Sequence, residues 1–231
     1  MDAMPQKAIP NAQSLIFNPD RRLPLVLVCD TSGSMIGAPI DQLNLGLQTF
    51  NREVSSDAIA LRRIEAAVVE FNSTVTVRQD FATVDQFQMP VLAAGGMTSM
   101  ATAVTRALAM AEARKRDYSA HSVDYYRPII LLNSDGASSE PLDAAIKAVA
   151  AAERDKKAAF FAVGVDGADF SELQRLSVRP VLHLLNLDFP SLFQWLSRSA
   201  VQGSKSPLNQ GMQFQPTPAN VIQVSQGSAR P

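Results

Sequence analysis

Residues 23–35, LPLVLVCDTSGSM, join a short apolar run to a turn of small polar residues. An apolar run of this length, with Val at alternate positions, is typical of a strand buried on both faces of a parallel sheet. Asp30, Ser32 and Ser34 follow where the strand ends, and in open α/β sheets ligands bind outside the carboxyl ends of the strands. Because these three side chains offer only oxygen atoms, the loop suits a hard cation such as Mg2+, Mn2+ or Ca2+.

Strand and helix patterns alternate along the chain, which predicts an α/β fold: a doubly wound, mostly parallel central sheet with helices on both faces. The runs 62–71 and 75–81 flank the turn residues 72–74 and predict a hairpin whose second strand is an antiparallel edge of the sheet. A helix is expected from Pro39, which suits a first helical turn. Further strands are expected at 128–133, 158–165 and 181–185, and further helices at 100–115, 141–156, 170–176 and 189–201.

The composition argues against several classes of function. The 231 residues carry a formal net charge of −1, which gives no electrostatic case for a nucleic-acid or membrane-surface partner. No segment approaches the roughly 20 apolar residues that span a bilayer, so membrane insertion is not expected. The single cysteine, Cys29, excludes an internal disulfide and a zinc site built from several thiolates. It fits a reducing compartment, and we expect a cytoplasmic protein.

Shifts in composition divide the chain into three segments. Residues 1–20, punctuated by three prolines, are expected to form an irregular N-terminal arm, and residues 21–202 the folded domain. Residues 203–231 are rich in Gln, Ser and Pro, with one dense apolar patch at 221–224. We predict a disordered C-terminal tail, because this segment cannot bury enough apolar surface to offset its ordering entropy.

Two further loops carry chemistry similar to that of the first. Thr98 lies in a loop of small residues directly before the helix expected at 100–115. Asp135 follows the strongly apolar strand at 128–133, so the first and third loops both lie at carboxyl ends of buried strands. Asp30 and Thr98 are also ordinary helix caps and turn formers, so each of them alone is a weak indication of a site.

Taken together, these positions resemble a known family. Residues 30–34, DTSGS, match the DxSxS motif of von Willebrand factor A (VWA) domains, and Thr98 and Asp135 match that family's later threonine and aspartate. The resemblance implies a Rossmann-like VWA fold with a metal-ion-dependent adhesion site (MIDAS). In the family, Ser32 and Ser34 would bind the cation directly and Thr98 directly or through water, while Asp30 and Asp135 act through waters or hydrogen bonds.

The resemblance also implies a function without catalysis. The cation keeps an open coordination position that an acidic residue of a partner protein fills. Mg2+ is the expected ion, with Mn2+ and Ca2+ as alternatives. No catalytic residue is expected.

A narrower resemblance links the chain to the bacterial tellurite-resistance VWA proteins of the TerY group. It rests on the stretches RRLPLVLVCDTSGSM, GLQTF, AGGMTSM, RPIILLNSDG and FPSLFQWLSRSA. It implies a role in a stress response, with a protein kinase and a PP2C-type phosphatase as partners. The chain departs from this group in its 20-residue arm and in Ser134-Asp135, where Thr-Asp is usual.

Two other functions remain open from the sequence. The segment LVCDTSGS resembles the nucleophile loop of haloacid-dehalogenase-type Mg2+-dependent phosphatases, DxDx[ST], but Ser32 stands where those enzymes need a second acid for proton transfer. Alternatively, the domain is a metal-independent scaffold that binds a partner through its tail, 203–231. His121 and His183 are interpreted as structural, since the sequence offers neither a nearby metal-ligand partner.

Overall fold

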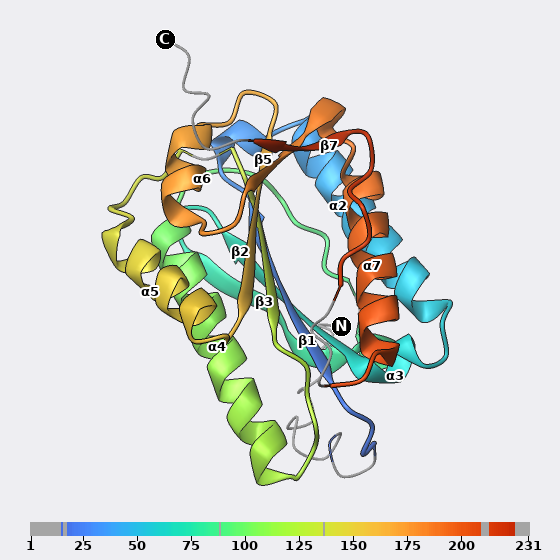
Figure 1. Ribbon diagram of the computed structural model, residues 1–231. Helices are drawn as coiled ribbons and strands as arrows, with labels where there is room; N and C mark the ends of the chain where they lie inside the picture. The colour runs from blue at the N-terminus through green and yellow to red at the C-terminus, as the bar shows by residue number, and fades with distance from the viewer. Residues whose placement is uncertain (1–14, 16–17, 88, 136, 209–212, 225–231) are drawn as a thin grey trace, which may run out of the picture.

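The computed structural model describes residues 15, 18–87, 89–135, 137–208 and 213–224. A central sheet lies between two layers of helices (Figure 1). The strand order is β3-β2-β1-β4-β5-β6-β7, with β2, β1, β4, β5 and β6 parallel and an antiparallel strand at each edge. The strands are β1 (Leu23–Asp30), β2 (Ile64–Phe71), β3 (Val75–Thr83), β4 (Ile129–Ser134), β5 (Ala159–Val165), β6 (Val181–Leu184) and β7 (Val221–Val224).

The predicted doubly wound α/β fold is therefore confirmed, and β7 adds a second antiparallel edge to the one expected at β3. Among the described residues, no helix is both long and apolar enough to cross a membrane. The helices are α2 (Ala38–Ser55), α3 (Ala60–Arg63), α4 (Met100–Ala120), α5 (Asp143–Arg154), α6 (Phe170–Leu176) and α7 (Phe189–Lys205), with short 3-10 turns η1 (Gly33–Met35), η2 (Val84–Gln86) and η3 (Leu185–Leu187).

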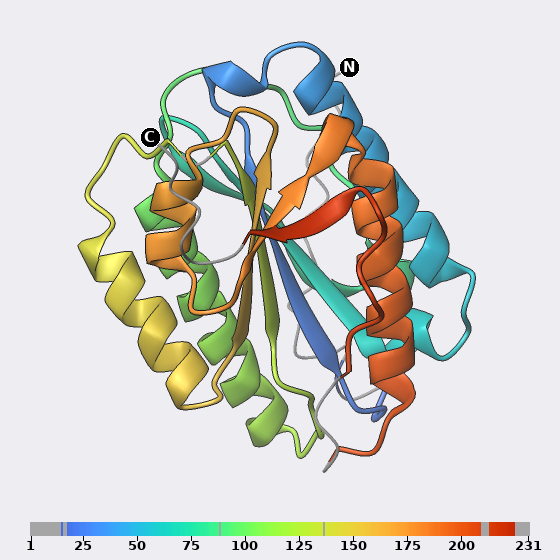
Figure 2. The same ribbon diagram turned by 45° about the horizontal axis from the view of Figure 1, so that its top comes forward.

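Strand β1 is buried on both faces, as its apolar run predicts. Its leucines and Cys29 pack into the core beneath α2 and α7, whereas Val26 and Val28 pack into the core beneath α4, α5 and α6. Figure 2 shows these two groups of helices on opposite faces of the sheet. A strand that feeds both cores must be apolar at every position, so β1 lies at the centre of the domain.

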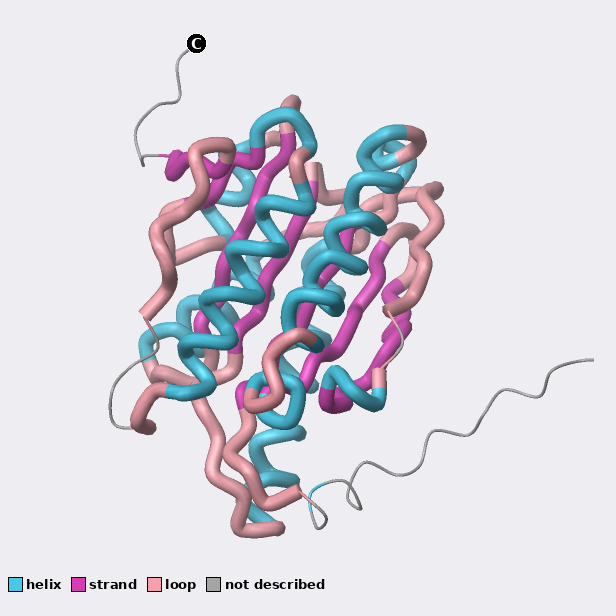
Figure 3. The backbone as a smooth tube through the Cα atoms, turned by 90° about the vertical axis from the view of Figure 1, so that its right-hand side faces the viewer, coloured by secondary structure: helices cyan, strands magenta, loops and turns pink. Residues whose placement is uncertain are grey.

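Helices α2 and α7 lie side by side over one face of the sheet (Figure 3). They approach closely at Gly46 of α2, where an added Cβ would lie 2.6 Å from Cδ2 of Phe193 and 2.8 Å from Cβ of Phe189. A glycine is needed at this crossing because any larger side chain would overlap α7.

The order of the strands sets the position of a ligand site. From β1 the chain passes to β2 on one side, and later returns to β4 on the other side of β1. The carboxyl ends of β1 and β4 lie at the same edge, since Cys29 pairs with Asn133 in parallel register. A reversal of this kind is the topological switch point at which α/β sheets bind ligands.

Two parts of the segment predicted to be disordered, residues 203–231, belong to ordered elements of the domain. Helix α7 continues to Lys205, and Val221–Val224 pairs with β6 as strand β7. Before it, the Phe214 ring lies 4.6 Å from that of Phe161 and 5.8 Å from that of Trp195. The composition of the tail describes it only in isolation. In the folded domain, the open edge of β6 supplies backbone hydrogen bonds to the tail, and α7 supplies apolar surface on which it packs. Residues 209–212 and 225–231 lie outside the described part.

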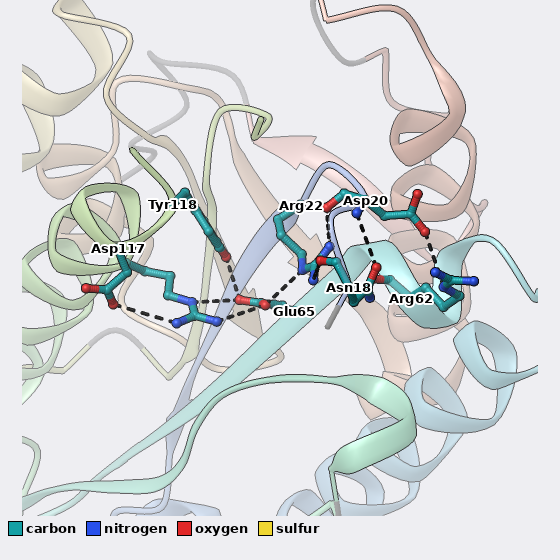
Figure 4. Close-up of polar contacts among 8 residues, drawn as sticks. Asn18, Asp20, Arg22, Arg62, Glu65, Asp117 and Tyr118 are labelled. Carbon is teal, nitrogen blue, oxygen red and sulfur yellow. Dashed lines mark hydrogen bonds and ion pairs between the residues drawn. The ribbon is translucent and has the colours of Figure 1, made fainter. Parts of the chain in front are cut away.

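A buried network of charged groups lies at the amino ends of β1 and β2 (Figure 4). The Glu65 carboxylate accepts hydrogen bonds from Arg22 Nε at 3.0 Å, from Arg114 Nε at 2.7 Å and from the Tyr118 hydroxyl at 2.6 Å. Arg22 also donates to the backbone carbonyls of Asn18 and Asp20. The end of the N-terminal arm is therefore fastened to the domain, while residues 1–14 and 16–17 lie outside the described residues.

Candidate metal site

Asp30 ends β1 and is fully buried. One oxygen, Oδ1, accepts a hydrogen bond of 2.9 Å from the backbone N–H of Ser32, and Oδ2 accepts one of 2.5 Å from the hydroxyl of Ser134. The first bond folds the loop back over its own aspartate, and the second joins the ends of β1 and β4. Asp30 therefore organises the loop from beneath.

The hydroxyls of Ser32 and Ser34 lie 3.0 Å apart and form a hydrogen bond. Ser32 is buried and Ser34 is exposed, because the tight turn η1 carries the chain from the strand end to the surface. Two adjacent hydroxyl oxygens, one of them open to solvent, are a suitable pair of ligands for a hard cation.

The loop that carries Thr98 is held against the first loop by backbone hydrogen bonds. Gly33 N–H donates to Gly96 O at 3.0 Å, and Gly95 N–H donates to Thr31 O at 2.8 Å. Figure 2 shows the blue loop after β1 close to the loop that leads into α4. The N-cap of α4 is Ser99, and no side-chain cap bond forms there, so helix capping does not account for Thr98.

Asp135 follows β4 in a third loop and is partly exposed. Its Oδ1 accepts a 3.3 Å hydrogen bond from Ala137 N–H, and its backbone carbonyl accepts a 2.6 Å bond from Asp169 N–H at the start of α6. Ser139 joins this loop to the second: its N–H donates to Thr98 O at 3.0 Å, and its hydroxyl accepts from Thr98 N–H at 3.1 Å. Backbone contacts thus link all three loops.

The electrostatics of the site are those of an uncompensated negative charge. Burial raises the pKa of Asp30, the hydrogen bonds from Ser134 and Ser32 lower it in part, and the nearby charge of Asp135 raises it further. Among the described residues, neither carboxylate forms an ion pair. The candidate metal ligands are two carboxylates and three hydroxyls. This set of oxygen ligands, with its unbalanced negative charge, fits a divalent cation. Within the same part of the chain, no group of three or more His, Cys, Asp or Glu side chains is placed to hold a metal ion.

The structure brings the predicted residues to one edge of the sheet by different means. Side-chain or backbone hydrogen bonds join Asp30, Ser32 and Ser34 directly. Thr98 and Asp135 are positioned by the hydrogen bonds that hold their loops in place. Within the described residues, no hydrogen bond joins their side chains to Ser32 or Ser34. Sequence reasoning missed Ser134, whose hydroxyl bonds Asp30. The signal was present, because Ser134 ends the strand beside β1.

Comparison with protein families matches residues 25–194 to the von Willebrand factor type A domain. This chain belongs to the VWA family. The match begins within β1 and extends past β6. It includes all five candidate ligands, with Asp30 at the end of β1 and the other four in the loops between the strands. Among curated protein sequences, none matches the chain.

Several solved structures share the VWA fold. Proximal thread matrix protein 1 from the mussel byssus, with a zinc-occupied MIDAS motif, is 15% identical with a TM-score of 0.54, and the match covers 78% of this chain and 48% of that one. The manganese-loaded TRAP protein of Plasmodium vivax is 18% identical (TM-score 0.51; 69% and 64% covered). The VWA domain of the pilus tip protein Mfa5 from Porphyromonas gingivalis is 11% identical (0.57; 81% and 98%). The chain thus spans about half the length of the mussel protein.

Proposed function

We propose that this VWA domain is a non-catalytic protein-binding module that uses a MIDAS cation to engage an acidic residue of a partner. Ser32 and Ser34 would bind the ion through their hydroxyls, with Thr98 as a further hydroxyl ligand. Asp30 and Asp135 would act through waters or hydrogen bonds. When bound, the ion supplies positive charge and an open position for the partner's carboxylate.

One observation carries the proposal: Asp30 is a fully buried carboxylate that meets only neutral donors and a second carboxylate. A buried charge without a partner is strongly unfavourable, so proteins pair such groups or place them beside metal ions. A cation at the mouth of this loop would supply the missing charge. Two structural neighbours are described as holding manganese or a zinc-occupied MIDAS, which supports a divalent ion here.

The expected ion is Mg2+, with Mn2+ and Ca2+ as alternatives. The oxygen-only ligand set suits all three ions, and Mg2+ keeps several waters when few carboxylates bind it. Calorimetric titration of the metal-free domain with each ion measures the preference. Ser34→Ala should abolish or sharply weaken ion binding, because it removes an exposed hydroxyl without disturbing the fold. Thr76→Ala, an exposed hydroxyl on β3, is the matched control and should bind normally.

We place the domain in a cytoplasmic tellurite-resistance or stress-response system, with a protein kinase and a PP2C-type phosphatase as its partners. The support is the resemblance of five stretches of this sequence to the TerY group. The test is binding of the purified domain to a protein kinase and to a PP2C-type phosphatase from the same organism, in Mg2+ and in EDTA. Metal-dependent binding that Asp30→Ala removes supports the proposal, and binding unchanged in that variant and in EDTA contradicts it.

The absence of catalysis can be tested separately. Ser32, which stands where a phosphatase of the dehalogenase type needs an acid, cannot transfer protons in that role. The domain should show no turnover of a generic phosphate ester in excess Mg2+. Turnover that disappears in Asp30→Asn would replace the binding-module proposal with an enzymatic one.

A further inference from the structure

Two large apolar side chains are exposed within two residues of a proposed metal ligand. Ile36 lies two residues after Ser34 and is 64% exposed, and Met97 lies directly before Thr98 and is 61% exposed. Scattered apolar residues are common on protein surfaces and need no explanation. These two, however, each adjoin a proposed ligand, and the backbone bond from Gly33 to Gly96 holds their loops together.

Both residues are presented by a constrained backbone. Ile36 N–H donates to Gly33 O at 3.3 Å, and the next residue, Gly37, has a φ of 89°. Met97 N–H donates to the hydroxyl of Ser73 at 2.9 Å, and the preceding residue, Gly96, also has a φ of 89°. Glycine adopts this left-handed conformation without strain, so both turns are stable. A partner that covers these side chains would therefore have little backbone to order.

The charges around the site point to the same kind of contact. The loops 30–40, 91–101 and 135–142 contain three charged residues, Asp30, Asp135 and Glu140, and all are acidic. Glu140 is engaged by the N–H and hydroxyl of Thr102, at 3.3 and 2.7 Å. No basic residue of these loops can pair with an incoming carboxylate. The cation must therefore supply the positive charge, and Ile36 and Met97 offer exposed apolar surface in the loops beside it.

We infer that the partner's acidic residue is flanked by aliphatic or aromatic side chains, which pack on Ile36 and Met97 around the bound ion. This inference rests on the proposed function. It also narrows the partner, because further acidic residues beside the contact would be repelled by Asp135 and Glu140, and polar or basic ones would not cover the apolar surface of Ile36 and Met97. Binding should therefore depend on the metal and respond only weakly to added salt.

A displayed library of short peptides with a fixed central Asp and random flanking residues tests the inference. In MgCl2, the domain should enrich peptides with Leu, Ile, Met or Phe beside the Asp, and EDTA should release them. The double variant Ile36→Ser/Met97→Ser should bind the enriched peptides about tenfold more weakly, as expected for the lost burial of two partly exposed side chains. Its affinity for Mg2+, measured by calorimetry, should be unchanged.

The matched control is Ile59→Ser/Val178→Ser, which removes two other exposed apolar side chains, 46% and 56% exposed, from loops away from the site. It should bind the peptides normally. Enrichment of polar or basic flanks, or full affinity in the Ile36/Met97 variant, would overturn the inference and leave the proposed function intact. Retention of peptides in EDTA, or no enrichment at all in MgCl2, would overturn both.

Discussion

Asp30 and Glu65 are two fully buried carboxylates on the neighbouring strands β1 and β2, Asp30 at the carboxyl end of β1 and Glu65 at the amino end of β2. Glu65 accepts hydrogen bonds from two arginines and a tyrosine (Figure 4). Asp30 accepts hydrogen bonds from the backbone N–H of Ser32 and the hydroxyl of Ser134, and the nearby charge that raises its pKa is a second carboxylate, Asp135. The two residues share their burial but differ in whether the protein supplies a counterion.

The negative charge of Glu65 is balanced by the two arginines that contact it, Arg22 and Arg114. Burial by itself would lower the pKa of Arg114, but the Glu65 carboxylate more than offsets this and raises it. Burial and the same carboxylate raise the pKa of the Tyr118 hydroxyl, which stays protonated and donates. This network stabilises the arrangement of β1, β2 and α4. A buried carboxylate that the protein itself pairs with arginines has a structural role, whereas one without such partners is a candidate for binding an external cation.

The largest effect should follow from removing the Glu65 charge. Glu65→Gln removes the buried carboxylate that Arg22 and Arg114 share, and leaves Arg114 paired with the exposed Asp117 at 3.6 Å. It should lower the free energy of unfolding by about 3–5 kcal/mol, measured in urea. Glu112→Gln, which breaks a more exposed pair with Lys115, is the control and should cost less than about 0.5 kcal/mol. If the two variants lose equal stability, the buried network contributes no more to folding than a surface ion pair. Tyr118→Phe, which removes only a hydrogen bond, gives an intermediate and folded variant.

An intermediate effect should follow from adding the ion. Mg2+ at about 100 times its dissociation constant should raise the free energy of unfolding by about 2.7 kcal/mol, because only the folded protein presents the site. Thermal unfolding in MgCl2 and in EDTA measures the shift. Ser34→Ala should show no shift, whereas Glu65→Gln should keep it if the variant folds. A shift of equal size in Ser34→Ala would mean that the ion acts elsewhere.

The smallest effect concerns pH in the metal-free protein. Because burial raises the pKa of Asp30 above that of the unfolded chain, the folded state holds this proton more tightly. The contribution of Asp30 to stability is therefore lost as pH rises from about 3.8 through its folded pKa. In EDTA, Asp30→Asn should gain stability relative to the unmodified protein over this rise in pH, measured in urea at several pH values. A stability difference between the two proteins that stays constant with pH would show that folding does not shift the pKa of Asp30.

The sequence predicted well those features that arise from local patterns. The apolar run of β1 indicated a central strand because a strand between two helical layers must be apolar at every position. Asp30 and Asp135, each at the end of a buried strand, indicated two loops at the same end of the sheet, since parallel strands end together. The place of Thr98 beside them rested on the family resemblance. The alternation of strands and helices indicated the fold, and the comparison with the VWA family agrees with it.

Other features depend on contacts between segments that are distant in the chain. The helix expected at 100–115 extends to Ala120 as α4, where the Tyr118 hydroxyl donates a hydrogen bond to Glu65, 53 residues earlier in the chain. Strand β7 forms because β6 leaves an edge open, which the composition of residues 203–231 could not indicate.

The sequence by itself determined the helices and strands and the polar residues at their ends, because hydrophobic periodicity and turn chemistry act over a few residues. Only the tertiary structure decided which buried carboxylate meets arginines and which does not. Counterions come from whichever elements pack together: α4 and the segment before β1 bring them to Glu65, and the loops around Asp30 bring only hydroxyls, backbone groups and a second acid.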